Sequence, residues 1–137
     1  MRLPIYYVDA FAENLFQGNP AAVVTLAESL KTTTMQSIAF ENNLSETAFV
    51  SIRSMPFSIR WFSPLVEVDL CGHATLASAR ILFDNHLPPD SSEVNFSAKR
   101  GSLRAFKKDD LIYLDFPAEK PSGNEQNAAL ARALGAK

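Results

Sequence analysis

The sequence predicts an α+β domain in which a curved, mostly antiparallel sheet wraps around one central helix. Several short segments show the apolar and β-branched patterning of strands. Residues 72–85 form a helix whose surface is almost wholly small or apolar, and a helix of this kind is usually surrounded by protein. We therefore expect helix 72–85 inside the sheet and a second helix, residues 32–43, outside it.

The outer helix is predicted from apolar residues that recur at three and four positions, with a threonine among residues 32–34 as its cap and Asn42 and Asn43 at its end. A turn at residues 18–20 separates the first two strands, because glycine tolerates positive φ and proline pre-sets its own. The predicted strands are residues 3–11, 22–26, 45–52, 56–64, 93–98, 102–107 and 111–116.

The composition changes near the end of the chain, which predicts the domain organisation. Residues 1–117 form the domain just described. In residues 118–137, prolines, a glycine and polar residues indicate a linker, and AALARALGAK then begins a helix with nothing left in the chain to pack on. We expect this region to be a linker and the truncated start of a second domain.

Composition and charge exclude several classes of protein. The 137 residues are 47% apolar and 20% charged with a net charge of −2, which is typical of a globular domain and argues against nucleic-acid binding through a basic face. No apolar run is long enough to span a bilayer, and the first residues lack a signal peptide's apolar region. One cysteine cannot form an internal disulfide, which fits a cytoplasmic protein.

The first turn of helix 72–85 carries the only cysteine and one of the two histidines. A helix N-terminus presents unpaired N–H groups and partial positive charge; Gly72 leaves them accessible, and Asp69 is placed to cap the helix. Such an end can hold a substrate carboxylate. His73 can exchange a proton near neutral pH, and we expect the pKa of the Cys71 thiol to be lowered there. The structural alternative is a packing cysteine and a capping histidine.

Glu46 is the second candidate for chemistry. It starts a strand beside the buried helix, where partial desolvation would raise its pKa and suit general acid/base catalysis; the alternative is a solvent-facing glutamate at a turn. Asn19 either hydrogen-bonds a ligand or only makes its turn. His86, at the end of the helix, is assigned no chemistry. The spacing of one cysteine and two histidines predicts no metal site.

Four separated motifs, in order and at the family's spacing, resemble the N-terminal half of the PhzF-like, phenazine-biosynthesis-type isomerases: VDAFAENLFQGNPAAVV, MQSIAFENNLSETAFV, IRWFSPLVEVDLCGHATLASA and YLDFPA. The resemblance covers about the first 118 residues. It implies the diaminopimelate-epimerase-like fold, with two similar domains, each a barrel-like sheet around a central helix, and an active site in the cleft between them.

The resemblance also implies roles for particular residues. Glu46 matches a general acid/base that shuttles a proton between carbons of the substrate, and His73 matches a histidine that contacts the substrate and can assist this transfer. The phenazine enzyme isomerises a dihydro-hydroxyanthranilate without cofactor or metal, so we expect no cofactor, no metal and a small carboxylate-bearing substrate. The candidate substrate-binding residues are Asn19, Ser45, Gly72 and Asp69.

Two alternatives stay open beside the PhzF-like interpretation. Related epimerases and racemases use a cysteine at the matching helix start, so Cys71 is the alternative base of a cysteine-dependent half-enzyme; a non-catalytic, oligomerising remnant is the third hypothesis. Family members carry a second domain, and a lone half exposes its cleft wall and sheet edge. We therefore expect little activity from the chain alone, and either a homodimer or a complementary second-half chain as partner.

Overall fold

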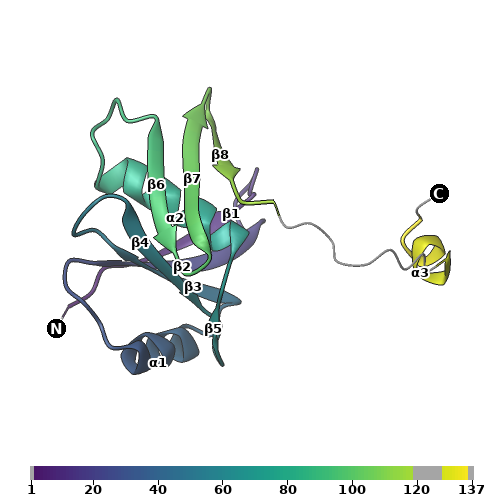
Figure 1. The fold of residues 1–137 in the computed structure, drawn as a ribbon, viewed down its shortest axis with the longest axis horizontal. Helices are drawn as coiled ribbons and strands as arrows, with labels where there is room; N and C mark the ends of the chain where they lie inside the picture. Colours follow the sequence, from purple (N-terminus) through teal and green to yellow (C-terminus); the bar gives the residue numbers. More distant parts are fainter. Residues whose placement is uncertain (1, 119–127, 136–137) are drawn as a thin grey trace.

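The structure is a computed structural model that describes residues 2–118 and 128–135. Figure 1 shows one curled sheet with a helix inside it and a second helix outside. The strands are β1 (Ile5–Ala10), β2 (Asn19–Leu26), β3 (Glu46–Ser51), β4 (Phe57–Phe62), β5 (Glu67–Val68), β6 (Glu93–Ala98), β7 (Gly101–Lys108) and β8 (Leu111–Asp115). The helices are α1 (Thr32–Asn42), α2 (Gly72–Asn85) and α3 (Ala128–Ala133).

The sheet runs in the order β1-β2-β3-β4-β6-β7-β8, with β5 paired to β4. Two neighbouring pairs are parallel, β2 with β3 and β4 with β6, and the other pairs are antiparallel, which confirms the mostly antiparallel sheet. In the parallel pair β2–β3, Ala21 lies opposite Glu46. This register places the first residues of both strands at the same end of the sheet.

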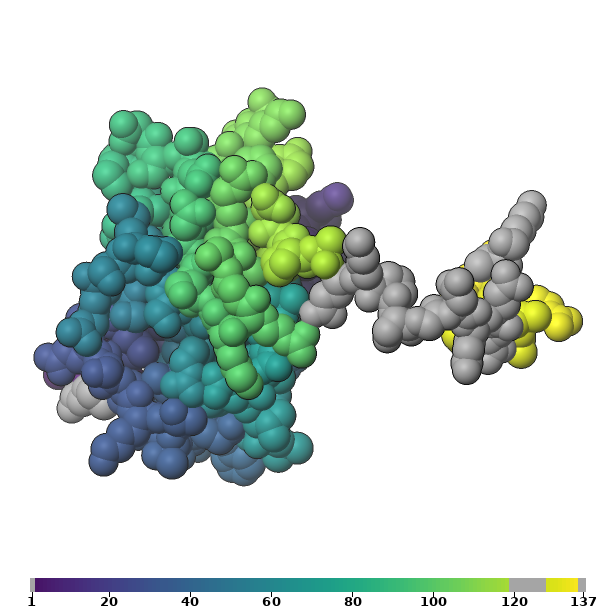
Figure 2. Space-filling view, in the orientation of Figure 1, coloured from purple at the N-terminus to yellow at the C-terminus, as the bar shows by residue number. Residues whose placement is uncertain are grey.

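The sheet wraps around α2, as predicted. One face of the helix is built from small side chains that let the strands approach closely, and three larger apolar side chains fill the remaining space. The helix packs on β1, β2, β3, β6 and β8. In Figure 1 β6 and β7 cross in front of it, and in Figure 2 residues of these strands form this face of the molecule. The buried residues of α2 are Ala74, Thr75, Ala77, Ser78, Ala79, Ile81, Leu82 and Phe83.

Helix α1 lies outside the sheet, also as predicted. Its Met35 and Ala39 pack on the outer face of β2, β3 and β4 in a second apolar cluster. The predicted threonine cap is wrong: Lys31 is the N-cap, and it makes no side-chain capping bond. The helix is held instead by packing and by Gln36, whose Nε2 donates to the carbonyl of Ser63 at 2.8 Å. The predicted end is confirmed, because Asn43 adopts the left-handed conformation that terminates the helix.

Strand β5 was not predicted from the sequence, and the predicted tail is described only in part. β5 has two residues, too few to show any periodicity, so sequence analysis missed it. Helix α3 lies in the predicted tail helix, and none of its residues is buried. The predicted linker lies almost entirely outside the described residues, and the predicted domain boundary stays a prediction. None of the described helices has the length and apolar character needed to cross a membrane.

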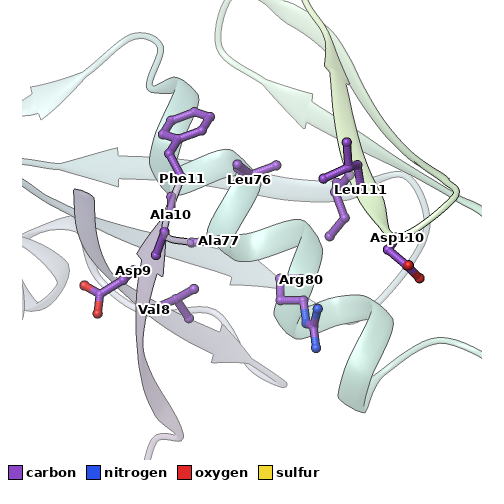
Figure 3. A pocket seen from close by; sticks show the side chains of 11 residues that line it. Val8, Asp9, Ala10, Phe11, Leu76, Ala77, Arg80, Asp110 and Leu111 are labelled. Atoms are coloured by element: carbon purple, nitrogen blue, oxygen red, sulfur yellow. The ribbon is translucent and has the colours of Figure 1, made fainter. Parts of the chain in front are cut away.

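The curled sheet leaves a seam between its edge strands β1 and β8. A cavity of about 310 Å³ lies in this seam, over α2. Figure 3 shows side chains of β1 and of the start of β8 on its two sides and those of α2 between them. The side chains labelled there are Val8, Asp9, Ala10, Phe11, Leu76, Ala77, Arg80, Asp110 and Leu111.

Candidate functional site

The first residues of β3 and α2 meet at one end of the sheet. Glu46 begins β3 and His73 is the second residue of α2. His73 Nε2 lies 3.4 Å from Glu46 Oε2 and 3.3 Å from Ser45 Oγ. The side chains of His73 and Glu46 are 11% and 22% exposed, so both are largely shielded yet reachable from solvent.

Cys71 lies on the other side of the imidazole. Its Sγ is 3.4 Å from His73 Nδ1, and the residue is 7% exposed. Burial raises the pKa of the Cys71 thiol to about 11; the charge of Glu46 adds to this, and the backbone N–H groups of Ala74 and His73 oppose it only in part. The predicted lowering of this pKa is therefore wrong, because desolvation outweighs the helix N-terminus.

The raised pKa of the Cys71 thiol also affects which nitrogen of the His73 ring carries a proton. At neutral pH Cys71 is protonated, so its S–H can donate to His73 Nδ1 or to the carboxylate of Glu46. A neutral imidazole that accepts at Nδ1 carries its proton on Nε2. That N–H then faces the carboxylate of Glu46 and the hydroxyl of Ser45. The carboxylate of Glu46 and the hydroxyl of Ser45 thus both lie beside His73 Nε2 at the first turn of α2.

Gly72 separates Cys71 from His73 at the first position of α2. A Cβ added there would lie 3.7 Å from Phe116 Cε2, an ordinary van der Waals contact. Packing therefore does not require glycine at this position. Gly72 itself is partly exposed and adds no side chain over the start of the helix, where backbone N–H groups can attract an anion.

Asp69 does not cap α2, contrary to the prediction. Its carboxylate pairs with Lys99 Nζ at 2.7 Å and Arg100 Nε at 3.2 Å, and these partners, Lys99 first, lower its pKa. The N-cap of α2 is Cys71, which makes no side-chain capping bond. The sequence does not predict this cluster, because KRGS indicates only the turn between two strands. The adjacent basic pair is the available signal, but it does not say which carboxylate it meets.

Asn19 is the first residue of β2 and is exposed. It lies two residues before Ala21, which is opposite Glu46 in the register. Because side chains alternate along a strand, Asn19 is on the same face of β2 as Ala21 and Val23, the face that packs on α2. The structure thus places Asn19 at the cluster's end of the sheet, whereas Ser45, Glu46 and His73 are in direct contact.

The same cluster is where a metal ion could be held. Glu46, Cys71 and His73 each offer one ligand atom, and these atoms lie within 4.8 Å of one another. Sequence spacing had predicted no such group, since the residues come from two separate elements. A thiol binds metal as thiolate, however, and the raised pKa of Cys71 opposes that form near neutral pH.

Comparison with known proteins relates the chain to a family. The sequence profile of the phenazine biosynthesis-like proteins matches residues 8–136. An uncharacterized isomerase of Pseudomonas aeruginosa is 49% identical over 136 residues, which is 98% of this chain and 52% of that protein. A mouse phenazine biosynthesis-like domain-containing protein is 46% identical over 125 residues, 85% of this chain and 43% of that protein.

Solved structures show the same relation. A PhzF-family protein of Enterococcus faecalis superposes with a TM-score of 0.85 at 46% identity, covering 100% of this chain and 52% of that one. A hydroxyproline epimerase of Agrobacterium vitis shares the fold, with a TM-score of 0.58 at 10% identity over 82% of this chain and 40% of that one. The chain spans about half the length of the curated relatives it matches. It belongs to the phenazine biosynthesis-like, or PhzF, family of isomerases.

Proposed function

We propose that this chain contributes the Glu46–His73 part of an isomerase active site, which moves a proton between two carbons of a small carboxylate-bearing substrate. The observation that carries the proposal is the 3.4 Å approach of Glu46 Oε2 to His73 Nε2. It joins a carboxylate that can exchange protons to a group that can hold and orient it. Family membership supports an isomerase.

The proposed step conserves atoms and electrons within the substrate. Glu46 removes a proton from one carbon, the electrons of that C–H bond move into an adjacent double bond system, and the same carboxyl group returns the proton to a second carbon. The product is an isomer of the substrate, so the step needs no oxidant or reductant. His73 holds the carboxylate through its Nε2 side, and Ser45 Oγ, next to the same nitrogen, defines the ring's position.

The first turn of α2 is the proposed site for the substrate's carboxylate. Backbone N–H groups at a helix start attract anions, and Gly72 carries no side chain that would block them. Asn19, at the same end of the sheet, is proposed to contact the substrate from β2. Asp69 forms ion pairs with two basic side chains. We therefore propose that it holds the loop before α2 in place next to the bound substrate.

We further propose that the other wall of the cleft comes from the half of the family's length that this sequence does not contain. Large apolar side chains stand exposed in two loops that lead to the cluster's end of the sheet; Phe16, for example, is 98% exposed. Exposed apolar patches of this kind mark interaction surfaces. A complementary second-half chain, or a second copy of this chain, is the proposed partner, and little turnover is expected without it. The apolar residues concerned are Phe11, Leu15, Phe16, Leu65 and Val66.

The test is solvent-deuterium incorporation. The chain is assayed alone and mixed with the C-terminal half of a close bacterial relative, with dihydro-hydroxyanthranilate and other small unsaturated cyclic carboxylates as probes. We expect exchange at carbon only in the mixture, and its loss in Glu46→Gln. Robust turnover by the purified monomeric chain would disprove the requirement for a partner. The absence of exchange under every condition, together with stable oligomers, would favour a non-catalytic assembly protein.

A cysteine-dependent epimerase or racemase is the second candidate function, and the contact of Cys71 Sγ with His73 Nδ1 at 3.4 Å favours it. The raised pKa of the thiol argues against a resting thiolate. Comparing Cys71→Ser with Glu46→Gln separates the two candidates. The PhzF-like step predicts exchange that survives in Cys71→Ser and is lost in Glu46→Gln, and the cysteine-based step predicts the opposite.

A further inference from the structure

Glu46, Cys71 and His73 bring three kinds of metal-binding atom to one point of the molecule: a carboxylate oxygen, a sulfur and a ring nitrogen. One such atom from each residue lies within 4.8 Å of the other two. Among the residues that the structure describes, no other group of three or more histidine, cysteine, aspartate or glutamate side chains comes this close. A metal ion offered to the chain therefore has one candidate site of this kind in the described part.

The separations within the cluster suit atoms that share one small metal ion. Zn²⁺ binds nitrogen, oxygen and sulfur at about 2.0–2.3 Å in a tetrahedral arrangement, which places neighbouring ligand atoms roughly 3.3–3.6 Å apart. Cys71 Sγ lies 3.4 Å from His73 Nδ1, so these two atoms already have the spacing of two ligands of one ion. Glu46 has the most exposed side chain of the three, and its carboxylate can turn to supply the third ligand.

The surroundings of the imidazole favour metal binding through Nδ1. A metal-binding histidine directs its other ring nitrogen at a hydrogen-bond partner, which fixes the orientation of the ring. His73 Nε2 has such a partner in Ser45 Oγ at 3.3 Å. Nδ1, on the other side of the ring, contacts the sulfur of Cys71. An ion bound between these two atoms would take the place of the thiol proton.

The ligand set selects a class of metal, and the cluster can be reached from solvent. The side chains of Glu46 and His73 are 22% and 11% exposed, so an ion can meet them before it meets the sulfur. Sulfur and imidazole ligands favour Zn²⁺ and similar ions, whereas Mg²⁺ and Ca²⁺ prefer sites made of oxygen. Burial raises the pKa of the Cys71 thiol, so the ion has to displace a firmly held proton. We therefore expect micromolar rather than tighter affinity.

We propose that Zn²⁺ binds reversibly to Glu46, Cys71 and His73 and thereby inhibits the isomerase site. Bonds form from the ion to Sγ, to one ring nitrogen and to one carboxylate oxygen; the thiol proton passes to solvent, and no electron is transferred. A Glu46 carboxylate that is bound to Zn²⁺ cannot take a proton from carbon. The inhibition rests on the proposed function, whereas the binding of Zn²⁺ does not.

The binding experiment titrates the full chain with Zn²⁺ in competition with a chromophoric chelator, and then with Co²⁺ as a spectroscopic probe. We expect one ion per chain and, with Co²⁺, an intense near-ultraviolet band from sulfur-to-metal charge transfer. Cys71→Ser should weaken Zn²⁺ binding about 100-fold or more and abolish the band. Mg²⁺ at millimolar concentration should not compete. The control is His86→Gln, which removes the chain's other histidine at the far end of α2 and should bind Zn²⁺ like the parent chain.

Glu46→Gln provides a second variant, because it leaves the thiol and the imidazole in place. It should weaken Zn²⁺ binding about tenfold. Equal Zn²⁺ affinity in the parent chain and in Cys71→Ser would overturn the proposal. Co²⁺ binding without the charge-transfer band, or no saturable binding at millimolar Zn²⁺, would overturn it as well.

The activity experiment separates this inference from the proposed function. In the complemented chain, Zn²⁺ should suppress deuterium exchange and a chelator should restore it, and the exchange that remains in Cys71→Ser should be about 100-fold less sensitive to Zn²⁺. Zn²⁺ binding without exchange in the metal-free mixture would disprove the proposed function and its inhibition, and leave the metal site standing. Exchange that continues when the cluster is saturated with Zn²⁺ would disprove the inhibition alone.

Discussion

The two ends of α2 each carry a histidine, and the two histidines have different surroundings. At the start of the helix, His73 contacts Ser45, Glu46 and Cys71. At its end, His86 Nε2 is buried with no hydrogen-bond partner among the described residues, and the residue lines a cavity. The contrast shows that one helix can position a histidine in two ways: among several polar partners, or with a ring nitrogen buried and unpaired.

The largest expected effect concerns the cluster. Glu46→Gln keeps the shape of the side chain but removes its ability to take a proton, so we expect the exchange activity of the complemented chain to fall about 10²–10⁴-fold. Deuterium incorporation measures the loss, and thermal unfolding checks that the fold is retained. Leu111→Ala, on exposed β8, is the control and should keep its activity. Activity within tenfold of the parent chain would remove Glu46 from the chemistry.

Both histidines are positioned by the same helix. A substitution that opens a cavity in the buried face of α2 should therefore destabilise both ends of the helix together. Leu82 is completely buried in α2, and Leu82→Ala should cost about 2–5 kcal/mol of unfolding free energy. Urea unfolding measures the change. The matched exposed control is Leu111→Ala, which should change stability by less than about 0.5 kcal/mol. Similar losses in the two variants would contradict the placement of α2 at the core.

The thiol beside His73 makes stability depend on pH. Its folded-state pKa of about 11 lies above its ordinary value of 9.0, so the folded state holds the proton to a higher pH than the unfolded chain. This contribution to stability is complete below pH 9 and is lost as pH rises to about 11, a loss of roughly 2–3 kcal/mol.

Cys71→Ala isolates this effect from that of other groups that titrate at high pH. Urea unfolding of both proteins at several pH values between 8 and 11 should show the parent chain losing its advantage across this window. Parallel curves would mean that the thiol pKa is not raised. Slow alkylation of Cys71 at neutral pH is the accompanying expectation, since the thiolate is the reactive form.

A substitution of Gly72 tests whether the N-terminus of α2 binds the substrate. Gly72→Ala places its Cβ at ordinary contact distance from Phe116, so stability should change by no more than about 1 kcal/mol. We nevertheless expect activity to fall about tenfold, because the added methyl group blocks close approach to the first N–H groups. Unchanged substrate affinity and turnover in Gly72→Ala would show that the substrate binds elsewhere.

The smallest effect is expected at the other end. Thr25 and Thr47 are fully buried on neighbouring strands, and only Thr47 has a partner for its hydroxyl among the described residues. Thr47→Val should cost about 1–3 kcal/mol because it leaves Asn42 Nδ2 unpaired. Thr25→Val should instead be neutral or stabilising by up to about 1 kcal/mol. Equal destabilisation of the two variants would mean that Thr25 is hydrogen-bonded in solution.

Local signals predicted much of the fold because their physical causes are local. The small and apolar residues of 72–85 predict the helix observed at Gly72–Asn85, and Asn43 ends α1 through its own left-handed backbone. The sequence-based predictions were wrong where a residue distant in the chain determines which partner a side chain binds. Asp69 was expected to cap α2, but Lys99 and Arg100, 30 and 31 residues further along the chain, bind its carboxylate instead.

The sequence by itself determined the family, the helix at the centre of the sheet and the residue types at its first turn. Only the tertiary structure decided how those groups behave. Burial reversed the direction in which the Cys71 pKa was expected to shift, and the register of β2 on β3 brought Asn19 to the end of the sheet where Glu46 meets His73. The cavity lined in part by Thr25 and His86 could not be predicted from the sequence for the same reason: desolvation and hydrogen bonding depend on neighbours in space, which come from distant positions in the chain.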